Sequence, residues 1–382
     1  MNNHYDVIVV GAGAVGSAAA YHAAKAGHRV LLLEQFEIDH QLGSSYGASR
    51  IIRYAYDNPV YVELAKATFP GWQALEAEAG ERLYTRTGGI DFAPAGEPAL
   101  SDIARSLQTA GIPFEVLTPE EARARFPQFR FEDDFQIIYQ ADSGVLEASK
   151  CVRAQVRLAR TRGAIVQAGT PVTGIEVGRD DVTVQTPRGA FHGARLVLVP
   201  GAWGREVFGM VGLNLPLTPV KAQEGYFAAE PASDFEPERF PVFIGHVRAR
   251  NGMISYGLPS IGGSGLKVGM HGGPPVADVA TMDRSPDMEA IEMARDFMRR
   301  FIPAGADAPL RLARPCLYTM TPDEHFVVDR HPQHPHVIIS ASCSGHAFKF
   351  SHLLGEILCD LAFVGETRHD VGLFRISRFA IA

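Results

Sequence analysis

Cysteine, tryptophan and basic charge are all scarce in this sequence of 382 residues. Its four cysteines, Cys151, Cys316, Cys343 and Cys359, show neither the paired spacing of a disulfide framework nor the clustered spacing of a zinc site. The formal net charge of -7 argues against a nucleic-acid surface, which needs a basic stripe. We therefore expect an intracellular protein with no nucleic-acid partner.

A long hydrophobic run is also missing. The small and apolar stretch from Val7 to Ala20 is interrupted by three glycines, so it predicts a strand, a turn and a helix rather than a membrane span. Residues 1–6 are too few and too polar for a secretory leader, and no basic run is present that would bind anionic lipid. These features predict a cytoplasmic protein without membrane contact.

The sequence gives no catalytic role to the histidines near the C-terminus or to the two tryptophans. His331, His334 and His336 lie in a proline-rich stretch that lacks a carboxylate or thiol cluster. We predict a solvated turn there and no metal site. Trp72 and Trp203 are interpreted as packing residues, because large aromatic side chains contribute most to stability when they are buried.

The first positive signal is a strand–turn–helix–strand unit near the start of the chain. The apolar run from His4 to Val10 predicts a buried parallel strand, and an alanine-rich helix ends at about Lys25. A second strand, from Arg29 to Leu33, is followed directly by Glu34. This order predicts a Rossmann-like βαβ unit.

Glycines occupy the turn of this unit at the spacing of a dinucleotide-binding loop. Gly11 permits the tight turn, Gly13 lets the backbone approach a pyrophosphate, and Gly16 lets the helix pack closely on the strand. The helix N-terminus presents N–H groups to the phosphates, and Glu34 can accept hydrogen bonds from a ribose diol. FAD and NAD use the same turn, so this pattern alone leaves both cofactors open.

The rest of the chain predicts an α/β (α+β mixed) fold of two interleaved domains. Helices are expected at about Tyr61–Glu78, Ala148–Arg162 and Lys349–Phe363, with two more between Leu100 and Phe126. Between Leu217 and Cys316 short strands with frequent Gly and Pro predict a mainly antiparallel sheet. The predicted dinucleotide-binding domain comprises residues 1–86, 144–216 and 317–382, and the substrate domain comprises residues 87–143 and 217–316.

Four segments carry a resemblance to a known family. They read GSSYGASRIIRYAY at residues 43–56, GLKVGMH at 265–271, CLYTMTPDEHF at 316–326 and SGHAFKF at 344–350. In this order they resemble the monomeric sarcosine oxidase and N-methyltryptophan oxidase family of FAD-dependent amine oxidases. The likeness extends over nearly the whole chain and favours FAD over NAD.

The resemblance implies a covalent flavin. In the family a cysteine sulfur bonds the 8-methyl carbon of FAD, and the matching position is Cys316. A thiolate must form for this reaction, so the thiol needs access and positive surroundings. The alternative is a buried, inert cysteine. Cys343 stands where the family usually has another residue, and it is either a packing residue or a second thiol near the ring.

The resemblance also assigns the cations. Arg53 and Lys349 match the pair that holds the substrate carboxylate, since an arginine fork binds a carboxylate bidentately and a lysine adds a point charge. Arg50 matches an arginine beside the flavin ring. Lys267 matches the lysine that assists the reaction with O₂. The alternative for Arg53 and for Lys349 is a surface ion pair. Arg50 could instead only stabilise the loop, and Lys267 could be a solvent-exposed lysine at a strand edge.

The remaining matched residues line the expected pocket. His271, Tyr256 and Tyr318 match residues that line the substrate pocket in the family. The alternative for His271 is a hydrogen-bonded histidine between the domains, and the alternative for the two tyrosines is core packing. The cofactor contacts implied near the ring are Ser44, Gly345 and His346. This chain departs from the family pattern at three positions: Ser45 and Tyr46 stand where histidines are common, and Ala48 replaces an acidic residue.

Taken together, these residues predict an oxidase of a small secondary (N-methyl) amino acid. Hydride passes to FAD, the imine is hydrolysed, and O₂ is reduced to H₂O₂. The alternatives are a flavin dehydrogenase that passes electrons to a partner and an oxidase of a cyclic imino or glycated amino acid. A further alternative is a dinucleotide-binding protein with no redox turnover, or an NAD enzyme. The resemblance implies a monomer whose partners are its amino-acid substrate and O₂.

Overall fold

The computed structural model describes residues 3–341 and 343–379. One of its two large sheets has six strands in the order β10-β3-β2-β14-β21-β20, in which neighbours run parallel except for the antiparallel pair β21 and β20. The strands are β2 (Val7–Val10), β3 (Val30–Leu33), β10 (Ile165–Gln167), β14 (Leu196–Leu198), β20 (Val327–Arg330) and β21 (Val337–Ala341). Short apolar strands of this kind are typical of a sheet covered on both faces. The Rossmann-like part of the predicted fold is confirmed.

Helices from distant parts of the chain pack beside this sheet. Helix α1 (Ala14–Lys25) contacts α5 (Ala148–Thr161) and α9 (Ser351–Phe363), and α2 (Pro59–Ala79) also contacts α9. Helices α1 and α9 approach closely because Gly355 has no side chain, and a Cβ there would lie 2.4 Å from the Cβ of Ala18. The sequence predicted all four helices to within a few residues.

A second, eight-stranded sheet has the order β19-β15-β18-β17-β16-β6-β8-β7. Its neighbours are antiparallel except for the parallel pair β16 and β6. The strands are β6 (Gly89–Pro94), β7 (Glu115–Leu117), β8 (Phe135–Gln140), β15 (Thr218–Phe227), β16 (Val242–Gly245), β17 (Ser255–Leu258), β18 (Leu266–Met270) and β19 (Leu310–Met320). The mainly antiparallel character predicted for this region is confirmed.

The two faces of the eight-stranded sheet differ because side chains alternate along each strand. One face carries a phenylalanine-rich core, with Phe92, Phe227 and Phe243, and packs against helix α7 (Met288–Phe301). Residues that pair directly across neighbouring strands have their side chains on the same face of the sheet. The register therefore places five polar residues together on the face opposite the phenylalanines: Asp91, Glu224, Lys267, Arg314 and Cys316. This polar face contributes the chemistry of the site described below.

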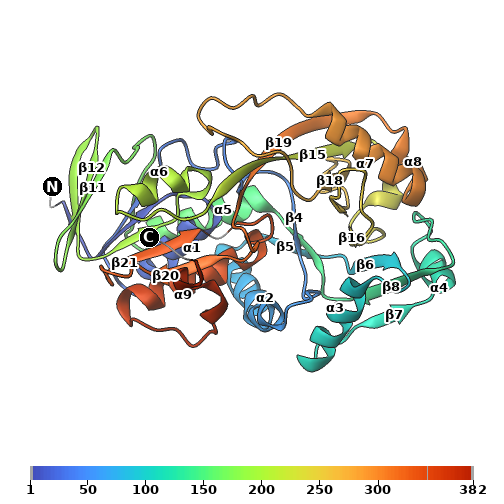
Figure 1. Cartoon of the computed structure of the whole chain (residues 1–382), viewed down its shortest axis with the longest axis horizontal. Coiled ribbons are helices and arrows are strands. Elements are labelled where there is room, and N and C mark those ends of the chain that lie inside the picture. Colours follow the sequence, from blue (N-terminus) through green and yellow to red (C-terminus); the bar gives the residue numbers. More distant parts are fainter. Residues whose placement is uncertain (1–2, 342, 380–382) are drawn as a thin grey trace.

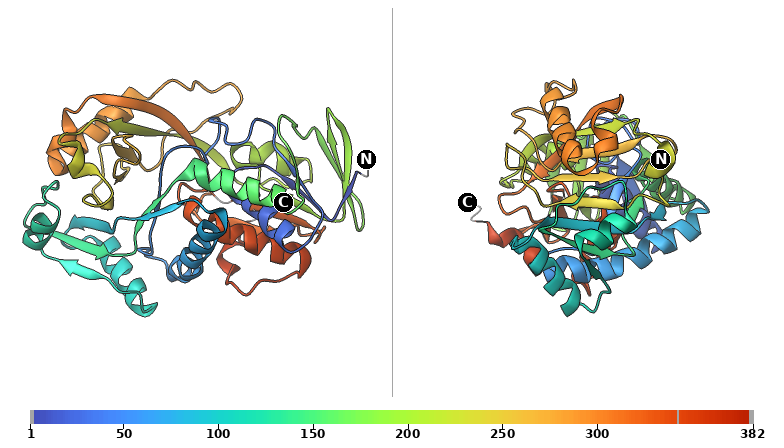
Figure 2. Two further views of the ribbon diagram at one scale, coloured as in Figure 1. Left: turned by 180° about the vertical axis from the view of Figure 1, so that it is seen from behind. Right: turned by 90° about the vertical axis from the view of Figure 1, so that its right-hand side faces the viewer.

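Smaller elements complete the molecule. A four-stranded sheet contains β1 (His4–Tyr5), β11 (Gly174–Val177), β12 (Val182–Thr186) and β13 (Gly189–Gly193), and a three-stranded sheet contains β4 (Arg50–Ile52), β5 (Tyr84–Arg86) and β9 (Gly144–Leu146). The short helices are α3 (Pro98–Thr109), α4 (Pro119–Arg125), α6 (Gly204–Gly209) and α8 (Pro303–Ala306). Figure 1 shows the four-stranded sheet and the strands β6 to β8 at opposite ends, with β15 and β19 running between them. Figure 2 shows the same elongated arrangement from behind.

Several predictions of local structure are wrong. Residues 4–10 form two strands rather than one, because the chain changes sheets at Asp6. Strand β1 pairs with β13, whereas β2 belongs to the six-stranded sheet. The second sheet is not made of short strands only, since β15 has 10 residues and β19 has 11. Helix α7 in the same region was not predicted at all.

Two corrections concern residues singled out from the sequence. Helix α9 begins at Ser351, so Lys349 lies in the preceding 3-10 turn, Phe348–Phe350, rather than in the helix. His331 does not lie in a solvated turn: it is buried, and its Nε2 lies 3.0 Å from the carbonyl oxygen of Val211. Across the described ranges, no helix combines the length and the apolar character needed to cross a membrane.

Candidate active site

A cavity of about 1350 Å³ extends from the glycine turn of the six-stranded sheet to the polar face of the eight-stranded sheet. Gly11, Gly13 and Glu34 line one part of it, and Arg53 and Lys349 line another. Sites formed where two structural units meet can draw functional groups from both. The cavity therefore joins the two groups of residues that the sequence singled out.

The glycine turn leaves room for backbone contacts only. Gly11 has φ +101°, and a Cβ there would lie 2.3 Å from the carbonyl oxygen of Val199. A Cβ on Gly16 would lie 1.8 Å from the carbonyl oxygen of Gly11, so neither position accepts another residue. Gly13 caps helix α1, whose N-terminus favours an anion.

Glu34 and the start of α1 complete a binding site for a dinucleotide. Glu34 lies at the end of β3, lines the cavity, and accepts a hydrogen bond from the N–H of Ala12 at 2.8 Å. Ser45 Oγ accepts from the N–H of Ala14 at 3.0 Å, which shows that a donor at the helix start points toward this loop. Because both of these N–H groups are already bonded within the protein, the features that fit a pyrophosphate and a ribose are the glycine backbone of the turn, the helix N-terminus as a whole and Glu34.

The structure brings Arg53 and Lys349 to the same aromatic ring. The guanidinium carbon of Arg53 lies 4.5 Å from the ring centroid of Tyr56, and Lys349 Nζ lies 5.3 Å from the same centroid. Lys349 Nζ also donates to Tyr56 Oη and to the carbonyl oxygen of His346, both at 2.8 Å. Two cations from segments nearly 300 residues apart therefore meet around Tyr56.

Burial and the neighbouring guanidinium disfavour the charged form of Lys349, and an anion bound beside the pair would favour that form again. The pKa of Lys349 falls well below its ordinary value, first because of burial and then because of the nearby Arg53 guanidinium. Burial, Lys349 and Arg53 also lower the pKa of His271 to about 4, so this imidazole is neutral at physiological pH. A carboxylate between the cations would offset their mutual repulsion. Trp72 Nε1 donates to the carbonyl oxygen of Lys349 at 2.6 Å and holds that turn in place.

Asp91 is a further residue of this site, and no sequence motif marks it. Its Oδ1 lies 3.2 Å from Arg53 NH1 and 2.9 Å from His246 Nε2, and the carboxylate is buried. Although burial alone would raise the pKa of Asp91, Arg53 and His246 hold it below its ordinary value. A lone acidic residue in the apolar strand β6 is the only signal that the sequence offered.

We expect Asp91→Asn to lower the free energy of unfolding by about 3 kcal/mol, because it leaves Arg53 buried without its counterion. A depressed pKa stabilises the fold above the ordinary carboxyl pKa, and this contribution is lost as the pH falls. Thermal unfolding of the variant should also respond more strongly to an added carboxylate ligand. The control is Asp133→Asn, since Asp133 is exposed and pairs with Arg123 at the surface. Equal effects of the two substitutions would contradict this role.

Lys267 is fully buried, with 1% of its surface exposed, and is not the exposed strand-edge lysine of the alternative interpretation. Its Nζ donates to Glu224 Oε1 at 2.8 Å and to the carbonyl oxygen of Ser49 at 3.1 Å. Arg50 NH1 lies 3.0 Å from the same Glu224 oxygen. Burial lowers the pKa of Lys267 to about 8, although Glu224 opposes this shift.

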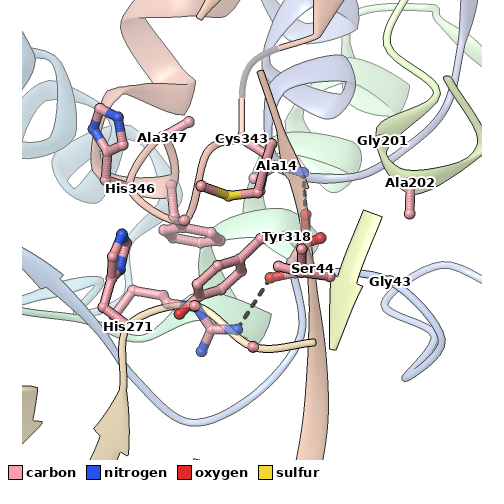
Figure 3. A pocket seen from close by; sticks show the side chains of 18 of the residues that line it. Ala14, Gly43, Ser44, Gly201, Ala202, His271, Tyr318, Cys343, His346 and Ala347 are labelled. Carbon is pink, nitrogen blue, oxygen red and sulfur yellow. Dashed lines mark hydrogen bonds between the residues drawn. The ribbon is translucent and has the colours of Figure 1, made fainter. Parts of the chain in front are cut away.

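Cys316 is less accessible than the resemblance implies. Its side chain is 3% exposed, and burial raises the pKa of its thiol to about 11 even though Arg50 NH2 lies 3.5 Å from the sulfur. Among the described residues that line the cavity, Cys343 is present and Cys316 is not. Figure 3 shows the Cys343 side chain in the pocket together with Tyr318.

Aromatic residues form the wall near the cations. Tyr256, Tyr318 and His271 line the cavity, and the ring centroids of His271 and Tyr318 are 5.5 Å apart. Figure 3 shows His271 and Tyr318 side by side. Gly345 has φ +75°, and a Cβ there would lie 2.5 Å from His271 Cε1. His346 and Ser44 also line the cavity, and a backbone oxygen of Ser44 accepts from Arg50 NH2 at 3.0 Å.

The fold and this cavity are those of a dinucleotide-binding protein whose cavity lies between two sheets. Residues 6–361 match the family described as FAD dependent oxidoreductase. The chain belongs to that family, and its cofactor is FAD. The choice between FAD and NAD that the glycine turn left open is thereby decided in favour of FAD.

Curated relatives cover the chain from end to end. It is 38% identical to a monomeric sarcosine oxidase of Bacillus sp. (strain NS-129), covering 100% of this chain and 98% of the relative. It is 33% identical to an N-methyl-L-tryptophan oxidase of Salmonella arizonae, covering 98% and 99%. The resemblance drawn from the four segments is confirmed.

Solved structures support the fold. An L-proline dehydrogenase from P. horikoshii superposes with a TM-score of 0.88 at 22% identity, covering 99% of this chain and 98% of that chain. A glycine oxidase from Geobacillus kaustophilus has a TM-score of 0.83 at 23% identity, covering 98% and 99%. At this identity the likeness concerns the fold alone.

Proposed function

We propose that this protein is an FAD-dependent oxidase of a small secondary, N-methyl amino acid. The observation that carries the proposal is the meeting of Arg53 and Lys349 around Tyr56, in the same cavity as the glycine turn. Curated relatives of full length are named for the oxidation of N-methyl amino acids, which supports the same substrate class.

The residues that would hold FAD lie along the cavity. Gly11 and Gly13 would face the pyrophosphate, while Gly16 keeps α1 packed against the turn. Glu34 would accept hydrogen bonds from the ribose, and Ser44, Gly345 and His346 would contact the region of the ring. When bound, FAD would supply a hydride acceptor for the substrate and a two-electron donor for O₂.

The side chains of the site would bind and orient the substrate. Arg53 and Lys349 would hold the carboxylate, and Tyr256 and Tyr318 would form walls around the amine. No strong base is required, because the amine need only be unprotonated, and His271 is neutral. For an N-methyl amino acid the balance is substrate, O₂ and water in, and primary amino acid, formaldehyde and H₂O₂ out.

The test is the stoichiometry of turnover by the purified yellow protein. With a panel of N-methyl amino acids we expect one H₂O₂ and one formaldehyde for each substrate consumed. Rapid anaerobic reduction of the flavin followed by slow reoxidation in air would instead favour the dehydrogenase alternative. An intact yellow protein that forms no peroxide with any secondary amino acid would refute the proposal.

The proposal includes a covalent bond between FAD and Cys316. Arg50 lies against the thiol and supplies the positive charge that a thiolate needs. After acid precipitation we expect the colour to stay with the protein, and digestion should place the added mass of FAD on the Cys316 peptide. Cys316→Ser should release the colour into the supernatant, whereas Cys343→Ser should retain it. Added mass on the Cys343 peptide would show that the cavity-lining thiol is the attachment point.

We further propose that the protein acts as a cytoplasmic monomer on a small-molecule substrate and O₂. Relatives named as monomeric enzymes support the monomer. Elution of the purified protein at the mass of one chain would agree with this assignment.

A further inference from the structure

Glu224 is a buried carboxylate to which the proposed chemistry has so far given no role. It lies in the middle of β15, with 2% of its surface exposed, on the polar face of the eight-stranded sheet. Its register partners are Arg314 on β19 and Gly269 on β18. A Cβ on Gly269 would lie 2.8 Å from Tyr256 Oη, so the side chain of Tyr256 occupies the space above this glycine.

Three cations surround this one carboxylate. Oε1 accepts from Lys267 Nζ at 2.8 Å and lies 3.0 Å from Arg50 NH1, and Oε2 lies 3.8 Å from Arg314 Nε. The hydroxyl of Tyr226 also donates to Oε2, at 3.2 Å. Burial alone would raise the pKa of Glu224, but the cations hold it at about 2, so the carboxylate is ionised.

The position of Glu224 relative to the cavity defines how it can act. Lys267 and Arg50 line the cavity, and among the described residues that line it Glu224 is absent. Lys267 comes from β18 and Arg50 from β4, which belong to different sheets. A single oxygen of Glu224 therefore fixes two cavity-lining cations from two sheets, while the carboxylate stays behind them.

We propose that Glu224 is a positioning residue that holds the ammonium of Lys267, in its charged form, at the place where O₂ is reduced. This inference rests on the proposed oxidase function. In the step concerned, O₂ takes two electrons from the reduced cofactor and two protons and leaves as H₂O₂. A fixed, desolvated cation stabilises the negative charge that develops on oxygen in that step.

The charge of Lys267 depends on its surroundings. The titratable and charged groups that face it are Glu224 and Tyr226 on β15, Arg50 on β4 and Cys316 on β19. Burial and Arg50 favour the neutral amine, and Glu224 favours the ammonium. Removal of the carboxylate should therefore lower the pKa of Lys267 further, so the lysine would lose its proton at a lower pH.

The test follows reoxidation of the holoenzyme. The flavin is reduced with dithionite, mixed with O₂ and followed by its absorbance over the pH range in which the fold is intact. In the wild-type protein the rate should fall as the pH rises through the pKa of Lys267. In Glu224→Gln we expect this fall to occur about one to three pH units lower. Reduction by substrate should change by no more than a few-fold.

A double variant separates positioning from plain stability. Glu224→Gln with Lys267→Met removes one cation and one anion, so the net charge of the cluster stays that of the wild type. If Glu224 acts through Lys267, the double variant should reoxidise at the rate of Lys267→Met alone. Independent effects that multiply in the double variant would overturn the inference.

The conservative variant Glu224→Asp should rescue the pH dependence of reoxidation. It also keeps the inference testable if Glu224→Gln folds poorly. It retains the charge and should keep the pH dependence near that of the wild type. A Glu224→Gln enzyme with wild-type rate and pH dependence would overturn the inference, and so would a Glu224→Asp enzyme with the shift expected for Gln. A wild-type protein that forms no peroxide would refute the proposed function itself, which distinguishes the two failures.

Discussion

Replacement of Lys349 by methionine is expected to lower kcat/KM for the amino-acid substrate by on the order of 10²-fold, or about 3 kcal/mol. Methionine keeps the length of the side chain but removes the charge, so Arg53 alone faces the substrate carboxylate. The contacts of Lys349 with Tyr56 and His346 show that the ammonium is held in a fixed place, and its loss therefore removes a positioned donor rather than a mobile one.

The measurement is steady-state peroxide formation with flavin reduction under anaerobic conditions as a second readout. The loss of rate should appear in the reduction of the flavin by substrate and not in its reoxidation by O₂. The residues that would bind the substrate carboxylate take no part in reoxidation. Lys66→Met is the control, since Lys66 is exposed and pairs with Glu63 at the surface. A Lys349→Met enzyme as active as the control would contradict the assignment.

Lys267→Met should produce the opposite pattern. Reoxidation by O₂ is expected to slow by on the order of 10²–10³-fold, the typical cost of removing one preorganised group that stabilises developing charge. Reduction by substrate should stay within a few-fold of the wild type. Because the pKa of Lys267 is lowered to about 8, the ammonium is present below that pH and is lost above it. Wild-type reoxidation should therefore decline as the pH rises through this region.

The two lysine variants serve as controls for each other. Stopped-flow absorbance of the flavin measures each half of the cycle separately, and each variant should impair one half only. A merely structural role of Lys267 would slow both halves or destabilise the protein. If Lys267→Met reoxidises at the wild-type rate, the role proposed for this lysine, and with it that of Glu224, is wrong.

Much of the fold could be predicted from the sequence because its signals are local. The glycine spacing, the apolar strands and the alanine-rich helix each occupy a few consecutive residues, and they led directly to the Rossmann-like sheet. The split of residues 4–10 into two strands could not be predicted in this way. It depends on the partner strand β13, which comes almost 190 residues later and pairs with His4 and Tyr5.

The candidate site was predicted unevenly for the same reason. The resemblance to a family supplied Arg53, Lys267 and Lys349, and the structure brings Arg53 and Lys349 together. Asp91 and Glu224 were missed, because their partners lie 38 and 43 residues away along the chain. Only the register of the eight-stranded sheet turns these two carboxylates to the polar face, and a single acidic residue in an apolar strand does not reveal a register.

The burial of Cys316 is a further consequence of tertiary structure. This residue pairs with Ala222 across β15 and β19 and packs in a small cluster with Val220 and Tyr318. The motif around the cysteine indicates attachment of a flavin, whereas its surroundings raise the pKa of the thiol. We therefore expect attachment to depend on Arg50, the cation that lies against the sulfur.

Recognition of the substrate's acid group by Arg53 and Lys349 can be tested by a coupling measurement. It compares kcat/KM for an N-methyl amino acid and for its neutral amide, in the wild-type enzyme and in Lys349→Met. The wild-type enzyme should prefer the acid, and this preference should fall by on the order of 10²-fold in the variant. The same preference in both enzymes would show that Lys349 does not bind the carboxylate.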